Sequence, residues 1–77
     1  MSIKVRYFAS LKDQLGHAEA ELSIDTPISA RLVWQQLNPN IHLPDGVLTA
    51  INQDYAQLDS VVADGDELAF FPPVTGG

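Results

Sequence analysis

Apolar and polar residues alternate in two stretches near the start of the chain. Residues 3–8 predict a first strand whose odd-numbered positions form one apolar face. Residues 18–25 alternate even more regularly and predict a second strand, antiparallel to the first. Between them, residues 10–16 break the alternation. They predict a turn or a short helix that ends at Gly16.

A helical period replaces the alternation in the middle of the chain. Apolar residues stand at i, i+3, i+4 and i+7, the spacing of one buried helical face; they are Ala30, Val33, Trp34 and Leu37. Ser29 stands just before this run and is the predicted N-cap. Residues 38–40 (Asn-Pro-Asn) end the helix, because the residue before a proline is disfavoured in the α region.

Further extended segments follow the helix. Residues 47–51 predict a strand, residues 52–54 a tight turn, and the extended course resumes at Tyr55. A turn at residues 64–66 then precedes a last strand over residues 67–71. The order of strand, strand, helix and further strands predicts a two-layer α+β domain, in which a mixed sheet packs on one main helix.

The six residues after this last strand have a different character. Pro72 and Pro73 have fixed φ angles and favour an extended tail that points away from the domain. Gly76 and Gly77 carry no side chain, so they fit a narrow channel. We therefore expect a domain over residues 1–71 and an extended, mobile tail over residues 72–77, with a reach of roughly 20 Å. The tail predicts a carboxylate that enters another protein's active site. A frayed chain end or a cloning remnant is the alternative.

Composition restricts the classes of function. The chain has 77 residues, no cysteine and a net charge of −6, with four Lys and Arg residues in all. The lack of cysteine excludes a disulfide framework, a thiolate nucleophile and an iron–sulfur cluster. The negative charge argues against nucleic acid as a partner. No apolar run is long enough to span a membrane, and no signal segment stands at the start, so we expect a cytoplasmic protein.

Candidate catalytic and metal-binding groups are sparse. His17 and His42 lie far apart in the sequence, without a second ligand at helical spacing, and argue against a metal site. The acidic residues at 64–67 resemble the start of a calcium loop, but position 75 is threonine where such a loop needs glutamate. No serine stands in a glycine-flanked nucleophile motif, and no glycine-rich phosphate loop occurs. We expect a chain that binds no cofactor and is no enzyme by itself.

Two aromatic residues are candidates for partner contacts. If Leu68 and Phe70 face the core, the period of two places Phe71 on the other face of the sheet. That face is uncovered in a two-layer fold, so we expect Phe71 to be exposed where the tail begins. Tyr55 is expected on the same face. Aromatic side chains at such positions carry much of the energy of protein interfaces.

Three blocks of sequence resemble a known family. They are residues 3–9 (IKVRYFA), residues 47–53 (VLTAINQ) and, most specifically, residues 64–77 (DGDELAFFPPVTGG). With them, nearly the whole chain resembles the small subunit of molybdopterin synthase, a sulfur carrier of the ubiquitin-like (β-grasp) family. Residues 26–28 make the approach to the helix slightly longer than expected for the family.

The resemblance implies a β-grasp fold and a function for the tail. An activating enzyme of the ubiquitin-activating type would use ATP and magnesium to adenylate Gly77, and a sulfur donor would convert it to a thiocarboxylate. The tail would then enter the large synthase subunit, in a heterotetramer of two small and two large subunits, and give sulfur for molybdopterin. Gly76 would allow close approach. The remaining partner contacts implied are Tyr55, Phe71, Pro72, Pro73, Val74 and Thr75.

Three other functions remain open at this point. The chain could carry sulfur for thiazole synthesis or another thiolation pathway. It could be a protein modifier that forms isopeptide bonds with lysines. It could also be an interaction module whose tail has no chemical role.

Overall fold

The computed structural model describes residues 1–73 and has nine elements of secondary structure. In chain order they are β1 (Ser2–Tyr7), α1 (Ser10–Leu15), β2 (Glu19–Ser23), β3 (Ile28–Ser29), α2 (Ala30–Leu37), β4 (Leu48–Ile51), β5 (Asp54–Ala56), β6 (Val61–Val62) and β7 (Glu67–Phe71). The predicted strands, short first helix and main helix are all present. The short strands β3 and β6 were not predicted, because two residues are too few to show a period.

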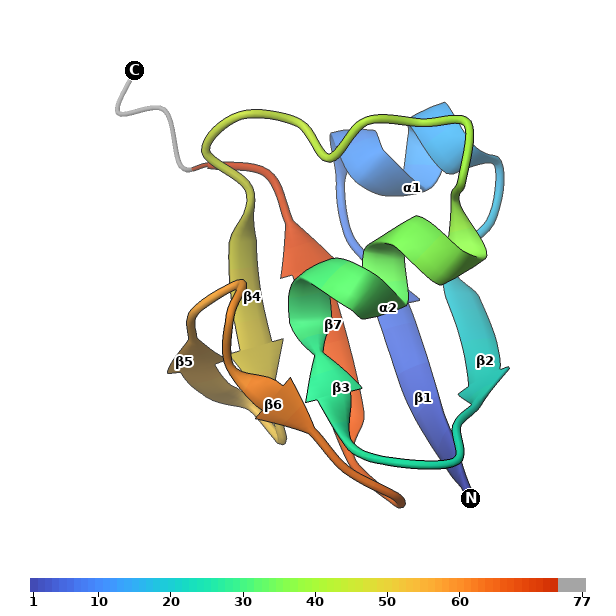
Figure 1. Cartoon of the computed structure of the whole chain (residues 1–77). Helices are drawn as coiled ribbons and strands as arrows, with labels where there is room; N and C mark the ends of the chain where they lie inside the picture. Colours follow the sequence, from blue (N-terminus) through green and yellow to red (C-terminus); the bar gives the residue numbers. More distant parts are fainter. Residues whose placement is uncertain (74–77) are drawn as a thin grey trace.

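Five strands form one mixed sheet in the order β2-β1-β7-β4-β5, and α2 crosses one face of it (Figure 1). The central pair, β1 and β7, is parallel, and the other neighbours are antiparallel. The predicted antiparallel pairing of the first two strands is confirmed. The mixed sheet on one main helix confirms the α+β prediction.

The core lies between the central strands and α2. Tyr7, Trp34 and Phe70 form an aromatic cluster there, with ring centroids 5.1 to 6.1 Å apart. Their neighbours in the core include Ile3, Val5, Ala30, Val33, Val62 and Leu68, all fully buried. The apolar face of β1 and the apolar stripe of α2 therefore meet as their periods predict.

Two hydrogen bonds satisfy the polar atoms of this aromatic cluster. The Asn38 side-chain amide donates to the Tyr7 hydroxyl over 3.2 Å, and the Trp34 indole N–H donates to the carbonyl of Ile41 over 2.9 Å. Burial raises the pKa of Tyr7 above its ordinary value, and the hydrogen bond from Asn38 opposes that shift. The bond to Ile41 also ties the loop after α2 to the core.

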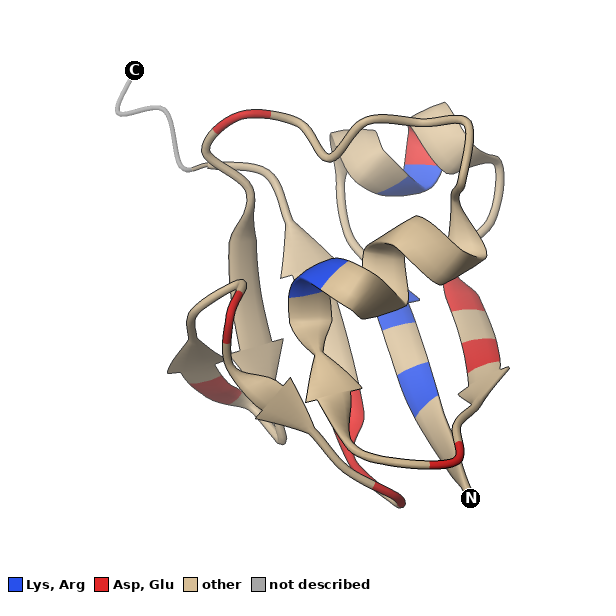
Figure 2. Ribbon diagram, viewed as in Figure 1, with Lys and Arg blue, Asp and Glu red and all other residues tan. Residues whose placement is uncertain are grey.

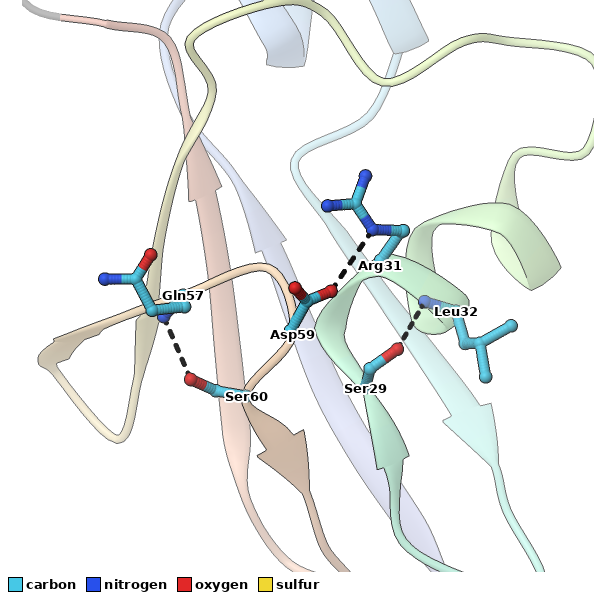
Figure 3. A network of polar contacts seen from close by, with 6 residues as sticks. All are labelled: Ser29, Arg31, Leu32, Gln57, Asp59 and Ser60. Atoms are coloured by element: carbon cyan, nitrogen blue, oxygen red, sulfur yellow. Dashed lines mark hydrogen bonds and ion pairs between the residues drawn. The ribbon is translucent and has the colours of Figure 1, made fainter.

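The start of α2 is held by capping and by the second, two-stranded sheet (Figure 3). Ser29 is the N-cap, and its Oγ accepts a hydrogen bond from the backbone N–H of Leu32 over 3.2 Å. Arg31 contacts Asp59 over 3.4 Å. The strand β3 pairs with β6 and leads directly into α2.

The predicted turns are present, and several of them use left-handed backbone. Asn52 and Gln53 have φ angles of 53° and 72° in the two-residue connection between β4 and β5. This geometry is typical of tight hairpins whose central residues both have positive φ. Gly16 ends α1 with a φ of 82°, as predicted.

Acidic residues occur in strands and loops across the fold, whereas basic residues are few (Figure 2). On β1, Lys4 and Arg6 stand opposite Glu21 and Glu19 of β2 in the strand register. Arg6 and Glu19 form an exposed ion pair at 3.3 Å. Exposed pairs of this kind contribute little stability, so they do not explain the fold. Among residues 1–73, no helix is long and apolar enough to cross a membrane.

Candidate functional site

The sheet face opposite α2 is divided into a charged half and an apolar half. Its residues are found from the register, because strand partners point to the same side of a sheet. The charged half lies over β2, β1 and the first residue of β7, and it contains Lys4, Arg6, Glu19, Glu21 and Glu67. The apolar half lies over β7, β4 and β5 and contains Leu48, Ala50, Tyr55, Ala69 and Phe71. The apolar half adjoins the point where β7 ends and the tail begins.

Three aromatic rings, those of Phe8, Tyr55 and Phe71, gather on the apolar half and are called the aromatic patch below. The ring centroid of Phe71 lies 6.4 Å from that of Phe8 and 5.8 Å from that of Tyr55. Tyr55 is 79% exposed and Phe8 is 45% exposed. The patch therefore offers apolar area to a partner without any rearrangement of the sheet.

The prediction that Tyr55 and Phe71 share a face is confirmed, but the expected exposure of Phe71 is wrong. Phe71 is half-buried, because the rings of Phe8 and Tyr55 pack against it from two sides. The sequence reasoning missed Phe8. Its position after Tyr7 placed it on the outer face, but only the parallel pairing of β1 with β7 brings it beside Phe71.

A shallow groove of about 300 Å³ runs across this face. Its lining residues are Arg6, Phe8, Ala50, Gln53, Tyr55, Glu67, Ala69 and Phe71. The small side chains of Ala50 and Ala69 form the floor, since these two residues are direct partners across β4 and β7. Arg6 and Glu67 place one charge of each sign at the border. The groove thus combines an apolar floor, aromatic sides and a polar edge, as interfaces commonly do.

The first two residues of the predicted tail lie against the domain. Pro72 is half-buried, and Pro73 is exposed with its ring beside Gly46. A Cβ placed on Gly46 would lie 3.3 Å from Cγ of Pro73. The other candidate residues of the tail, Val74, Thr75, Gly76 and Gly77, lie outside the described residues.

The two histidines contact different parts of the domain. His17 packs its ring on Tyr7 at a centroid distance of 5.5 Å, and His42 lines a pocket beside α2. Within residues 1–73, no group of three or more His, Asp or Glu side chains is arranged to hold a metal ion.

Comparison with known sequences matches this chain to one family over almost its full length. The sequence model of the ThiS family matches residues 5–77, which include the aromatic patch and the whole predicted tail. The chain belongs to the ThiS family. Two curated relatives are molybdopterin synthase sulfur carrier subunits. The subunit from Escherichia coli (strain K12) is 39% identical, and the alignment covers 97% of this chain and 99% of the relative. The subunit from Haemophilus influenzae is 38% identical with the same two coverages.

Solved structures of chains of similar length have the same fold. SAMP1 from Haloferax volcanii superposes with a TM-score of 0.79 at 27% identity, with all of both chains covered. A chain of the complex of subunits 1 and 2 of molybdopterin-converting factor from Helicobacter pylori gives a TM-score of 0.67 at 23% identity, also with full coverage. These matches confirm the β-grasp prediction, and the curated relatives confirm the family predicted from residues 64–77.

Proposed function

We propose that this chain is the sulfur carrier subunit of a molybdopterin synthase, with Gly77 as the residue that carries the sulfur. The observation that supports this most is the match of two such subunits, at 38% and 39% identity, over 97% of the chain. The match to the ThiS family model, over residues 5–77, includes the Gly76-Gly77 pair. The described residues agree with a carrier, because they offer an apolar partner surface beside the start of the tail.

The proposed chemistry has two steps at the Gly77 carboxylate. An activating enzyme transfers AMP from ATP, bound with magnesium, to the carboxylate and releases pyrophosphate. A sulfur donor at the oxidation level of sulfide then attacks the carbonyl carbon, a C–S bond forms, the C–O bond to AMP breaks, and a thiocarboxylate remains. This chain supplies no thiol, since it has no cysteine. Its part is to present a slim, unbranched end, which Gly76 and Gly77 provide.

The proposed partner for sulfur transfer is the large synthase subunit, in an assembly of two small and two large subunits. We place Tyr55, Phe71 and Phe8 at this contact, with Pro72 to Thr75 in the partner's channel. The exposed aromatic patch adjoins the end of β7, so one partner can hold the patch and receive the tail together. Such a carrier is not an enzyme by itself, and its place is the cytoplasm.

Intact-mass measurement tests the proposal directly. The purified chain is incubated with an activating enzyme, ATP, magnesium and a sulfide source. The expected result is a mass gain equal to the replacement of one oxygen by sulfur, confined to the C-terminal peptide. A matched chain that lacks Gly77 should keep its fold and gain no sulfur. Equal sulfur incorporation in that shortened chain would overturn the assignment.

A protein modifier is the second candidate. The observation that favours it is the likeness to SAMP1, a small archaeal modifier protein, at a TM-score of 0.79 and 27% identity. In that case the activated Gly77 would form isopeptide bonds with lysines of other proteins. Tagged chain expressed in cells distinguishes the two. Discrete high-mass conjugates that depend on Gly77 support a modifier, whereas co-purification with the pterin-forming subunit supports the carrier. Co-purification with a thiazole synthase would instead support a sulfur carrier for thiazole synthesis.

A further inference from the structure

The contact between Gly46 and Pro73 continues the register of the sheet beyond its last paired residues. Leu48 pairs with Phe71, and moving two residues outward along each antiparallel strand leads to Gly46 and Pro73. Pro73 has no backbone N–H and cannot extend the ladder of hydrogen bonds. Instead of a hydrogen bond, the proline ring packs on Gly46. Glycine leaves room for the ring because it has no Cβ.

Gly46 is held firmly in this position. It is the third residue of a turn in which the backbone N–H of Val47 donates to the carbonyl of Pro44 over 3.3 Å. Its φ of 77° lies in the left-handed region that glycine adopts most easily. The other end of the same loop is fixed by the hydrogen bond from the Trp34 indole to Ile41. The loop is therefore attached to the core on one side and to β4 on the other.

The space around Gly46 differs from that around the other left-handed glycines. A Cβ on Gly46 would lie 3.3 Å from Cγ of Pro73, which is tighter than most real Cβ contacts, and 3.5 Å from its Cβ, which is an ordinary contact. A Cβ on Gly16 or Gly65 would meet no atom within 4 Å, although their φ angles of 82° and 84° are nearly the same. Backbone conformation therefore explains glycine at all three positions, whereas only Gly46 is also restricted by the tail.

We propose that Gly46 is a positioning residue for the tail. By receiving the ring of Pro73 it sets the place and direction in which the chain leaves the sheet beside the aromatic patch. This inference rests on the proposed carrier function, and it assigns to the loop over residues 41–46 a part in aiming Gly77. Pro73 is four residues before Gly77, so its position sets where the chain leaves the domain toward the reactive end.

The three glycines provide a matched set of variants. Gly46→Ala, Gly16→Ala and Gly65→Ala introduce the same methyl group at the same kind of backbone, so all three should lower the melting temperature, and Gly46→Ala should lower it most because of the contact with Pro73. Only Gly46→Ala should displace Pro73. We expect it to lower the rate of sulfur transfer at saturating large subunit by roughly tenfold, since catalysis depends steeply on the position of the reacting group. Gly16→Ala and Gly65→Ala should keep the wild-type rate.

Removing the proline ring gives the decisive comparison. In a Pro73→Ala background, Gly46→Ala should cause no further loss of rate, because the methyl group then has no ring to displace. An equal loss in both backgrounds, or the same loss in Gly16→Ala, would overturn the proposal.

The geometry can also be tested without any activity. Nuclear Overhauser contacts between the Gly46 α-protons and the Pro73 ring protons are expected in the free wild-type chain. Their absence would refute the positioning role even where sulfur transfer is normal. If the contacts are present but the wild-type chain accepts no sulfur, the carrier function fails and the contact stands.

Discussion

The side-chain amide of Asn52 donates a hydrogen bond to the carboxylate of Asp66 over 3.0 Å and so joins two turns that are distant in sequence. The amide oxygen of the same residue accepts from the backbone N–H of Glu67, also over 3.0 Å. Asp66 accepts a further bond from the backbone N–H of Ala63 over 2.8 Å. The bond from Ala63 and the bond from Asn52 hold the pKa of Asp66 below its ordinary value. This link fixes the start of β7, the central strand that leads to the tail.

Replacing Asn52 by glycine should therefore reduce stability in a pH-dependent way. Asn52→Gly keeps the φ of 53° accessible and removes both side-chain bonds. We expect a loss of about 1 kcal/mol in the free energy of unfolding at pH 7. Because the folded state lowers the pKa of Asp66, its contribution is present above the ordinary pKa and is lost as the pH falls through the folded one. The difference between wild type and variant should narrow below about pH 4 in urea titrations.

Gln53→Gly is the matched control for this change. Gln53 is the neighbouring residue with positive φ, at 72°, and within residues 1–73 its side chain makes no hydrogen bond. The Gln53→Gly variant should keep or slightly raise the free energy of unfolding, and this effect should not change with pH. A variant at Asn52 whose loss stays the same from pH 7 to pH 3 would contradict the role given to Asp66.

Tyr7 should make the fold sensitive to alkali. Burial raises its pKa in the folded state, so tyrosinate forms more readily in the unfolded chain, and the stability that Tyr7 contributes is lost as the pH rises above about 10. Tyr7→Phe removes the hydrogen bond from Asn38 and should lower the free energy of unfolding by about 1 kcal/mol at pH 7. Thermal unfolding followed by circular dichroism should show that this loss shrinks or reverses above pH 10. Tyr55→Phe, at an exposed site, should keep the wild-type profile.

Tyr55 is expected to affect partner binding without affecting the fold. Its side chain is 79% exposed, so Tyr55→Ser should change the melting temperature little. If the aromatic patch is the contact with the large subunit, loss of the ring should weaken binding by about 1 to 2 kcal/mol, which calorimetry can measure. Val61→Ser is the control, because Val61 is 61% exposed and lies on β6, in the small sheet. Equal weakening in both variants would show that the contact is not specific to the patch.

Ser29 contributes to stability through its cap. Ser29→Ala removes the acceptor for the Leu32 N–H and should lower the free energy of unfolding by about 1 kcal/mol, measured by chemical denaturation. Ser29→Thr keeps a hydroxyl acceptor and also suits the strand β3, so most of the stability should return. Should threonine be as destabilising as alanine, the pairing of β3 with β6 rather than the cap would be the sensitive feature.

Much of this fold can be predicted from the sequence because its periods are local. The alternation in β1 and β2, the stripe on α2 and the left-handed turn at Gly16 each depend on residues close in sequence. The family resemblance supplied the β-grasp topology. The candidate surface was predicted in part, since the period of β7 places Phe71 on the outer face.

The rest depends on pairings between distant segments. Phe8 reaches Phe71 only through the parallel pairing of β1 with β7, and this pairing also explains why Phe71 is half-buried. Gly46 meets Pro73 only because β4 and β7 pair in one register out of several. No local pattern encodes these choices. They follow from which arrangement buries the apolar faces best.

The central position of β7 has a consequence for how the protein is made. β7 lies between β1 and β4 in the sheet, yet it follows both of them in the sequence. The sheet therefore cannot close during translation until residues 67–71 have left the ribosome. A chain cut short before them would leave two separate strand pairs, each with an open edge, and would be cleared as unfolded protein. Residues 67–71, which lead to the tail, are thus required for the closed sheet.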